Sequence, residues 1–396
     1  MIKVEPIRSD AGQVASGFAL WDLGFRPFYL LAGIFAASSI LLWIGQYAGY
    51  LSAAYLQGPA WHGHEMIFGY AMAVVAGFLL TAVRNWTGKP TPAGVALMAI
   101  AALWISGRIL VLTPYAVAAA IANAGFPITL AVGIGRAVVQ SRNRRNYFFL
   151  ALLLLLGLAT LAFHLSQLGV LQAPANASLY FGLDVILFIV AVISGRVVPM
   201  FTNNGVPGAG ATRHPLVEKA ALAGVVAMLA VDLFPVSPWV AAALAFGVAA
   251  AHAVRLYLWR PWGTRSVALV WILHVSYGWI VIYLALRGLA DIGVVGRQFA
   301  VHALTIGAIG GMTIGMMTRT ARGHTGRQLV ADRFDTSCYV MVSTAAAIRV
   351  FGGMWLPDAY LATVLVSGAC WSAAFALFVI RYWPVLSRSR VDGNPG

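Results

Sequence analysis

Apolar runs of about 20 residues follow one another along nearly the whole of this 396-residue chain. A run of that length crosses a bilayer as one helix, in which every backbone polar group is satisfied without water. The composition agrees, because 61% of the residues are hydrophobic and only 10% are charged. The sequence therefore predicts an all-α fold, a polytopic transmembrane helix bundle of about twelve helices. The predicted helices cover residues 28–50, 63–83, 93–112, 115–137, 147–170, 178–200, 216–233, 237–258, 266–287, 298–318, 336–355 and 360–383.

The basic residues predict how this bundle is oriented. The gaps that follow odd-numbered helices contain almost no Lys or Arg, only Arg287 and Arg297, whereas the other gaps are rich in both. Because cytoplasmic loops carry an excess of Lys and Arg, both termini are predicted to be cytoplasmic. The predicted organisation is a cytoplasmic N-terminal segment over 1–27, the helix bundle over 28–384 and a cytoplasmic tail over 385–396.

The net charge of +14 has the same origin as this asymmetry. The basic residues lie in short loops between apolar runs, so we expect the lipid bilayer to be the partner, and no nucleic acid. Cys338 and Cys370 both lie in apolar segments without a CxxC spacing. Neither a disulfide framework nor a thiolate metal site is therefore predicted.

Histidines inside the predicted helices give the strongest indication of function, because ionisable groups are costly to place in a bilayer. Most are expected in the outer leaflet, with His274 near mid-depth and His252 near an inner helix end. Neutral imidazole binds copper and iron, so these residues are candidate copper ligands or axial ligands of a haem. The alternative is that each imidazole is simply hydrogen-bonded within the bundle. The candidate metal and cofactor ligands are His62, His64, His164, His274 and His302.

Other ionisable residues are expected near the same depth. Arg108 and Arg349 are candidate partners for the propionates of a haem. Glu65 either fixes the tautomer of a histidine or stabilises the start of a helix, and the sequence leaves both roles open. Asp184 and Tyr180 lie one turn apart, where they could share a hydrogen bond or relay a proton. Glu65, Asp184 and Tyr180 are thus the candidate proton donors.

His62 and His64 are two residues apart, and this spacing leaves two arrangements open. In a helix their side chains point about 200° apart and serve two different sites. They can bind one metal only if the backbone is not helical there, which Gly63 would permit.

Gly307, Gly311 and Gly315 repeat every four residues in one predicted helix. Small residues with this spacing let two helices approach closely, so we expect this stripe to be a packing surface. His302 lies on a different side of the same helix and is expected to face another partner.

Several segments together resemble the NnrS family, in the same order along essentially the whole chain. They are 61–66 (WHGHEM), 77–83 (GFLLTAV), 85–88 (NWTG), 195–202 (GRVVPMFT), 302–305 (HALT), 310–312 (GGM), 318–319 (TR) and 323–327 (GHTGR). The resemblance implies a bacterial inner (cytoplasmic) membrane protein that carries haem, expected to be b-type, and copper. It also implies a role in tolerance to nitric oxide and nitrosative stress, often beside denitrification.

Three classes of function follow from these observations. The first is a metalloprotein that binds nitric oxide or a nitrosylated iron species, and that could reduce NO like a nitric oxide reductase with an electron donor such as quinol. The second is a transporter or channel for a metal, a proton or a small anion. The third is a sensor or cofactor store without turnover.

Overall fold

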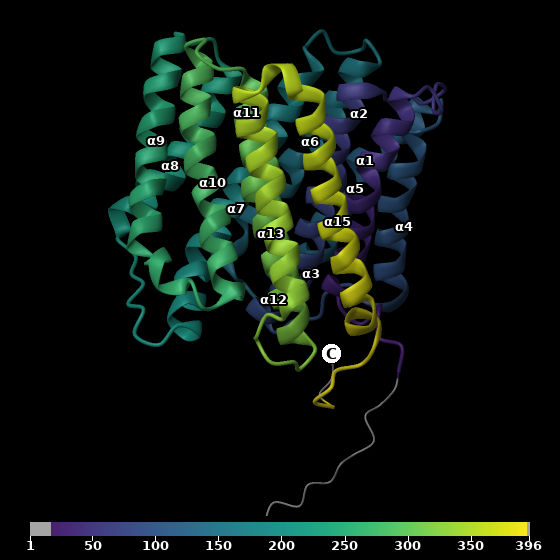
Figure 1. Cartoon of the computed structure of the whole chain (residues 1–396). Helices are drawn as coiled ribbons and strands as arrows, with labels where there is room; N and C mark the ends of the chain where they lie inside the picture. Colours follow the sequence, from purple (N-terminus) through teal and green to yellow (C-terminus); the bar gives the residue numbers. More distant parts are fainter. Residues whose placement is uncertain (1–16, 394–396) are drawn as a thin grey trace, which may run out of the picture.

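The protein forms a bundle of upright helices in a computed structural model that describes residues 17–393 (Figure 1). Within that range there is no named β-strand, which confirms the predicted all-α class. The first half contains α1 (Phe25–Tyr47), α2 (Gly58–His64), η1 (Glu65–Ala71), α3 (Met72–Thr87), α4 (Gly94–Leu110), α5 (Ala116–Gln140), η2 (Arg144–Asn146), α6 (Phe148–Gln167) and α7 (Ala175–Gly205). The second half contains α8 (Pro215–Leu233), α9 (Pro238–Leu258), η3 (Pro261–Thr264), α10 (Ala268–Asp291), α11 (Arg297–His302), η4 (Ala303–Gly310), α12 (Gly311–His324), α13 (Arg333–Ala347), η5 (Ile348–Gly352), α14 (Gly353–Trp355), η6 (Pro357–Ala359) and α15 (Tyr360–Ser387).

Ten helical segments of the described chain are long and apolar enough to cross a membrane. Two further helices complete the twelve that the hydropathy predicts. One is α4, which is apolar but has only 17 residues. The other is α8, whose 19 residues include Glu218, Lys219 and Asp232. The protein is therefore a multi-pass membrane protein, with each predicted apolar run found as a helix.

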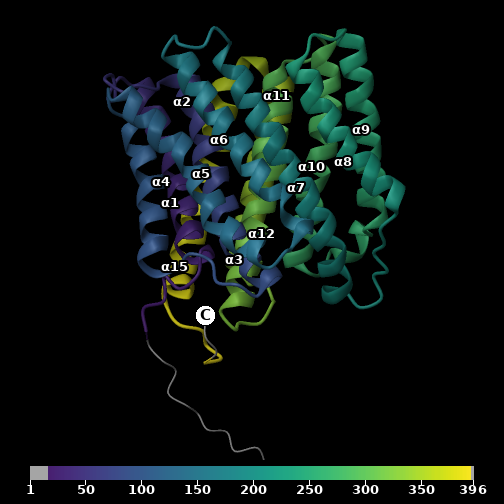
Figure 2. The ribbon, with the colours of Figure 1, turned by 180° about the vertical axis from the view of Figure 1, so that it is seen from behind.

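The two ends of the described chain meet at one end of the bundle, which we call the terminal face (Figure 1). The backbone N–H of Ala19 donates to the carbonyl of Ser387 over 2.8 Å. The described parts of the predicted terminal segments, residues 17–27 and 385–393, lie here, and residues 1–16 and 394–396 are outside the described residues. The loops between α1 and α2 and between α6 and α7 lie at the other end, which we call the opposite face (Figure 2).

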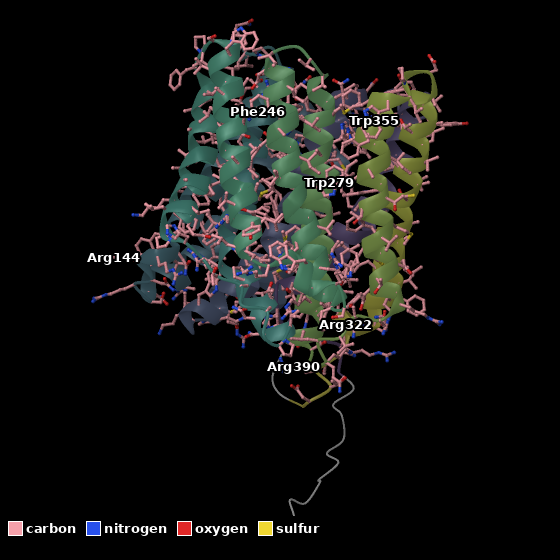
Figure 3. The ribbon with its side chains drawn as sticks, turned by 60° about the vertical axis from the view of Figure 1, so that its left-hand side comes forward. Arg144, Phe246, Trp279, Arg322, Trp355 and Arg390 are labelled. Atoms are coloured by element: carbon pink, nitrogen blue, oxygen red, sulfur yellow. The ribbon has the colours of Figure 1, made fainter. Side chains whose placement is uncertain are left out.

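The arginines labelled in Figure 3 lie toward one of these faces. Arg144, Arg322 and Arg390 lie toward the terminal face, whereas Phe246 and Trp355 lie toward the opposite face (Figure 3). The terminal face is therefore the one predicted to be cytoplasmic by its basic residues, and this orientation stays a prediction.

Close packing inside the bundle depends on small residues. A Cβ at Gly307 would meet the ring of Trp279, and a Cβ at Gly311 would meet Ser276. A Cβ at Gly315 would approach Ile272 to 2.9 Å. The glycine stripe thus packs against α10, as its spacing predicts.

Three membrane-spanning segments contain π-helical turns, which are rare and often mark functional sites. They are η1, η4 and η5. The first begins directly after His64, the second directly after His302, and the third includes Arg349. Each π-helical turn therefore begins beside a residue that the sequence singles out as a candidate ligand or propionate partner.

The predicted orientation can be tested with cysteines at the two faces, in a background where Cys338 and Cys370 are replaced by Ser. Ser52→Cys is at the opposite face and Thr212→Cys at the terminal face, and both native side chains are exposed. A membrane-impermeant maleimide should label Ser52→Cys in intact spheroplasts and Thr212→Cys only after lysis, because Arg-rich loops stay cytoplasmic. The reverse labelling pattern would show that the orientation is wrong.

Candidate metal site at the opposite face

Four of the five predicted histidines come together at the opposite face, in two separate pairs. His64 on α2 and His164 on α6 form the first pair, with ring centroids 4.8 Å apart and planes at 69°. Both side chains are fully buried. The Nε2 atoms of both rings are buried and have no hydrogen-bond partner. We call His64 and His164 the inner pair.

Hydrogen bonds on the other ring nitrogens hold the inner pair in place. Nδ1 of His64 lies 2.8 Å from Oε1 of Glu65, and Nδ1 of His164 lies 3.3 Å from the hydroxyl of Tyr55. The rings of Tyr55 and His164 are also stacked, with centroids 5.7 Å apart. Histidines that bind metals are oriented in this way, with one nitrogen hydrogen-bonded and the other free for the metal.

Glu65 is itself held by Arg108, whose Nε lies 3.1 Å from Oε2 of the carboxylate. The guanidinium also donates to the side-chain oxygen of Asn123. This settles the two roles left open for Glu65. Because α2 begins at Gly58, Glu65 is too far along the helix to stabilise its start, and its carboxylate contacts the histidine instead.

The close approach of Arg108 to η1 requires a glycine. A Cβ at Gly69 would collide with the guanidinium of Arg108. The Nε1 of Trp104 donates to the carbonyl of Gly69 over 3.1 Å, so α4 is tied to η1 at this point. Arg108 thus contacts Glu65 and Asn123 while its NH1 has no hydrogen-bond partner, and its role as a propionate partner stays a prediction.

His62 and His302 form the second pair, which we call the outer pair. Their ring centroids are 6.5 Å apart and their planes differ by 20°. Nδ1 of His302 lies 2.6 Å from the carbonyl of Gln298, and the ring of His62 packs on Trp43 at 5.1 Å. Both histidines are partly exposed.

The backbone decides how His62 and His64 are arranged. Gly63 lies inside α2, so the two imidazoles point to different sides of the helix. A Cβ at Gly63 would approach Leu179 to 2.9 Å, which explains the glycine by packing against α7. The structure therefore gives two histidine sites on α2, the second of the two arrangements that the spacing allows.

Arg349 lies beside the outer pair. Its segment η5 packs against α11, which carries His302. One guanidinium nitrogen donates to the hydroxyl of Tyr360 over 2.9 Å, while NH1 is buried without a partner. Arg349 thus keeps an unpartnered donor, as Arg108 does with its own NH1.

His274 lies apart from the other four candidate histidines, and its role as a metal ligand stays a prediction. It lies in the second turn of α10, which begins at the terminal face, and its Nε2 is 2.8 Å from the hydroxyl of Thr202. His252 lies near the terminal face as predicted, with its Nδ1 2.7 Å from the hydroxyl of Tyr277.

Asp184 and Tyr180 also differ from their predicted arrangement. Asp184 accepts hydrogen bonds from Tyr283 over 3.4 Å and from Arg287 over 3.5 Å, not from Tyr180. The ring of Tyr180 lies under the guanidinium of Arg297 at 4.5 Å. Arg287 at the end of α10 and Arg297 at the start of α11 both contact carboxylates on the preceding helices α7 or α8. They also share Asp232, at 2.6 Å from Arg287 and 3.1 Å from Arg297.

Sequence reasoning missed several partners at this face. Tyr55, Asn123 and Asp232 lie in loops or helices with no motif around them, and only the folded structure brings them to His164, Arg108 and the arginines. Arg287 and Arg297 did carry a signal. They are the exceptions to the charge bias of the loops, and both are used in ion pairs.

The donor set fits a metal bound by two imidazoles. No group of three or more His, Cys, Asp or Glu side chains suited to a metal occurs between residues 17 and 393. An imidazole centroid lies roughly 3 Å from a metal that it binds, so two rings on one ion are at most about 6 Å apart. The inner pair, at 4.8 Å, is within this limit, whereas the ring centroids of the outer pair are 6.5 Å apart.

The ion pair beneath His64 can be tested by charge removal. Arg108→Leu leaves the buried carboxylate of Glu65 without its cation and should lower the free energy of unfolding by about 3–5 kcal/mol. The double variant Glu65→Leu with Arg108→Leu should recover most of that loss, because no lone charge remains. Thermal unfolding of the purified proteins measures both effects. Equal stability of the parent and Arg108→Leu would contradict the ion pair.

Comparison with known families covers almost the entire chain. The NnrS protein family matches residues 19–390. The sequence matches no curated protein.

Proposed function

This chain belongs to the NnrS family, and on that premise we propose that its two histidine pairs hold copper and haem for reaction with nitric oxide. Membership supports, in general terms, a membrane protein of the nitric oxide response, and the family is associated with metal or haem binding. The proposed location is the bacterial inner membrane, with both histidine pairs toward the periplasm. This location depends on the predicted orientation.

The observation that carries the proposal is the inner pair. Two buried imidazoles present unpartnered Nε2 atoms, while their Nδ1 atoms are held by Glu65 and Tyr55. A buried nitrogen without a hydrogen bond is costly, and a metal ion removes that cost. Imidazole nitrogen is a good ligand for copper. Both rings are fully buried, which suits a single ion better than a macrocycle. The inner pair is therefore assigned to copper.

The outer pair is assigned to haem for three reasons. Its two imidazoles, with ring centroids 6.5 Å apart, would hold the iron. Both are partly exposed, whereas the inner pair is fully buried, so a large cofactor would be held here at the edge of the bundle. Arg349 supplies a guanidinium with a free NH1, the kind of group that pairs with a propionate.

The residues around the proposed metals have separable tasks. When bound, haem iron would supply the binding of nitric oxide and copper would supply a second redox-active centre. Glu65 fixes the tautomer of His64, and Arg108 compensates the charge of that carboxylate. The hydroxyl of Tyr55 lies 3.3 Å from Nδ1 of His164 and would orient that ring. Reduction of NO would in addition draw electrons from a donor such as quinol.

Single replacements by Ala test the two assignments. His64→Ala and His164→Ala should lose copper and keep the haem absorbance, whereas His62→Ala and His302→Ala should lose haem and keep copper. His274→Ala is the matched control, because this histidine is buried in the same bundle but bonded to Thr202. Metal analysis and an optical spectrum of each purified variant measure the outcome. Unchanged copper and haem in all four paired variants would refute the proposal.

Turnover is tested on the protein that holds both metals. With a quinol as reductant, an NO electrode should record steady consumption of NO that falls in His64→Ala and His302→Ala. A haem spectrum that shifts on addition of NO without any consumption would instead support a sensor or cofactor store.

A transporter is the second candidate, and the buried ion pairs among α7 to α10 favour it. Asp184, Asp232 and Arg287 form one cluster toward the opposite face. Glu218 and Arg255 form another toward the terminal face, 2.6 Å apart. Charged residues inside a bundle often mark ion pathways. Flux of protons or metal ions into proteoliposomes, lost in Asp184→Asn and retained in His64→Ala, would support this function over the first.

A further inference from the structure

A small apolar cavity lies one helical turn inward from the outer pair. Met66, Ile67 and Ala71 of η1 line one side, and Ile309 of η4 lies across from them. Leu183 and Ile186 of α7 close the cavity. Met66 follows His62 by four residues and Thr305 follows His302 by three, so the cavity lies about 5 Å below the imidazoles.

The π-helical turns explain why this space is not filled. A π-helix carries more residues per turn than an α-helix, so its side chains fall out of register with those of a regular neighbour. Here η1 and η4 line the same cavity. Protein interiors otherwise leave few voids larger than a water molecule.

Water is a poor occupant of this cavity. The lining contains two hydroxyls, and both are already hydrogen-bonded: Tyr70 to Thr313 at 2.5 Å and Thr305 to the carbonyl of Val301 at 2.9 Å. A buried water needs two to four polar partners, and apolar cavities stay dry and take up apolar guests such as xenon. The other described cavity, around Asp184 and Arg287, is lined by charged groups instead.

We propose that this cavity is a docking site for a small, uncharged, apolar gas molecule, which waits there beside the outer pair. Its size admits one molecule comparable to water, and its lining offers contacts only by dispersion. That the gas is nitric oxide, and that it reacts at the outer pair, rests on the proposed function. The presence of the site itself does not.

Xenon is the probe for the site alone. In crystals of the full chain under xenon pressure, anomalous scattering should show a xenon atom between η1 and η4 and none around Asp184. Ile309→Ala enlarges the cavity and should raise xenon occupancy, whereas Ala71→Val fills it and should abolish the peak. Ala73→Val, a buried alanine outside the lining, is the matched control and should keep the peak. No xenon in the parent and in Ile309→Ala, or an unchanged peak in Ala71→Val, would overturn the proposal.

Nitric oxide tests the link to the outer pair. After photolysis of NO from haem-loaded protein, Ile309→Ala should increase the fraction that rebinds before escape, and Ala71→Val should decrease it. If both variants rebind the same fraction of NO as the parent while xenon binds as expected, the cavity takes up gas but does not supply the haem. That result would overturn its role as a docking site for NO. Protein without haem but with xenon in the cavity would refute the proposed function and keep the gas site.

Discussion

The ion pair between Glu65 and Arg108 is the interaction on which the candidate site depends. A carboxylate in the interior of a membrane protein is stable only if a cation and hydrogen bonds compensate it. Arg108 supplies that charge from α4, and the carboxylate then fixes His64 on α2. A larger side chain in place of Gly69 would collide with the guanidinium of Arg108. The ion pair therefore also requires a close approach of η1 and α4. Orientation of one imidazole thus depends on contacts from two other elements.

The π-helical turns are the second constraint, because they change which side chains share a face. His64 and His302 each immediately precede such a turn, and Arg349 lies within a third. Residues beyond each turn are rotated relative to an unbroken α-helix. The apolar cavity beneath the outer pair lies between two of these turns, η1 and η4. A π-helical turn is costly compared with a regular helix, and such turns persist most often where function requires them.

Hydropathy was sufficient to predict the helices, since a span must be about 20 apolar residues whatever it packs against. It also placed the histidines by depth, and His62, His64, His164 and His302 lie at one face. His274, which was expected near mid-depth, lies in the second turn of α10 and apart from these four. The sequence could not predict the direction in which each side chain points around its helix. The division into an inner and an outer pair depends on helix packing, and the partners Tyr55 and Asn123 are set by contacts distant in sequence.

The central claim is that His64 and His164 share one metal ion, and X-ray absorption at the copper edge of the purified protein tests it most directly. The account predicts two imidazole ligands on copper in the parent protein, and one in His164→Ala if any copper remains. Sulfur scattering from Cys338 or Cys370, or a copper spectrum that is the same in the parent and in His164→Ala, would contradict it.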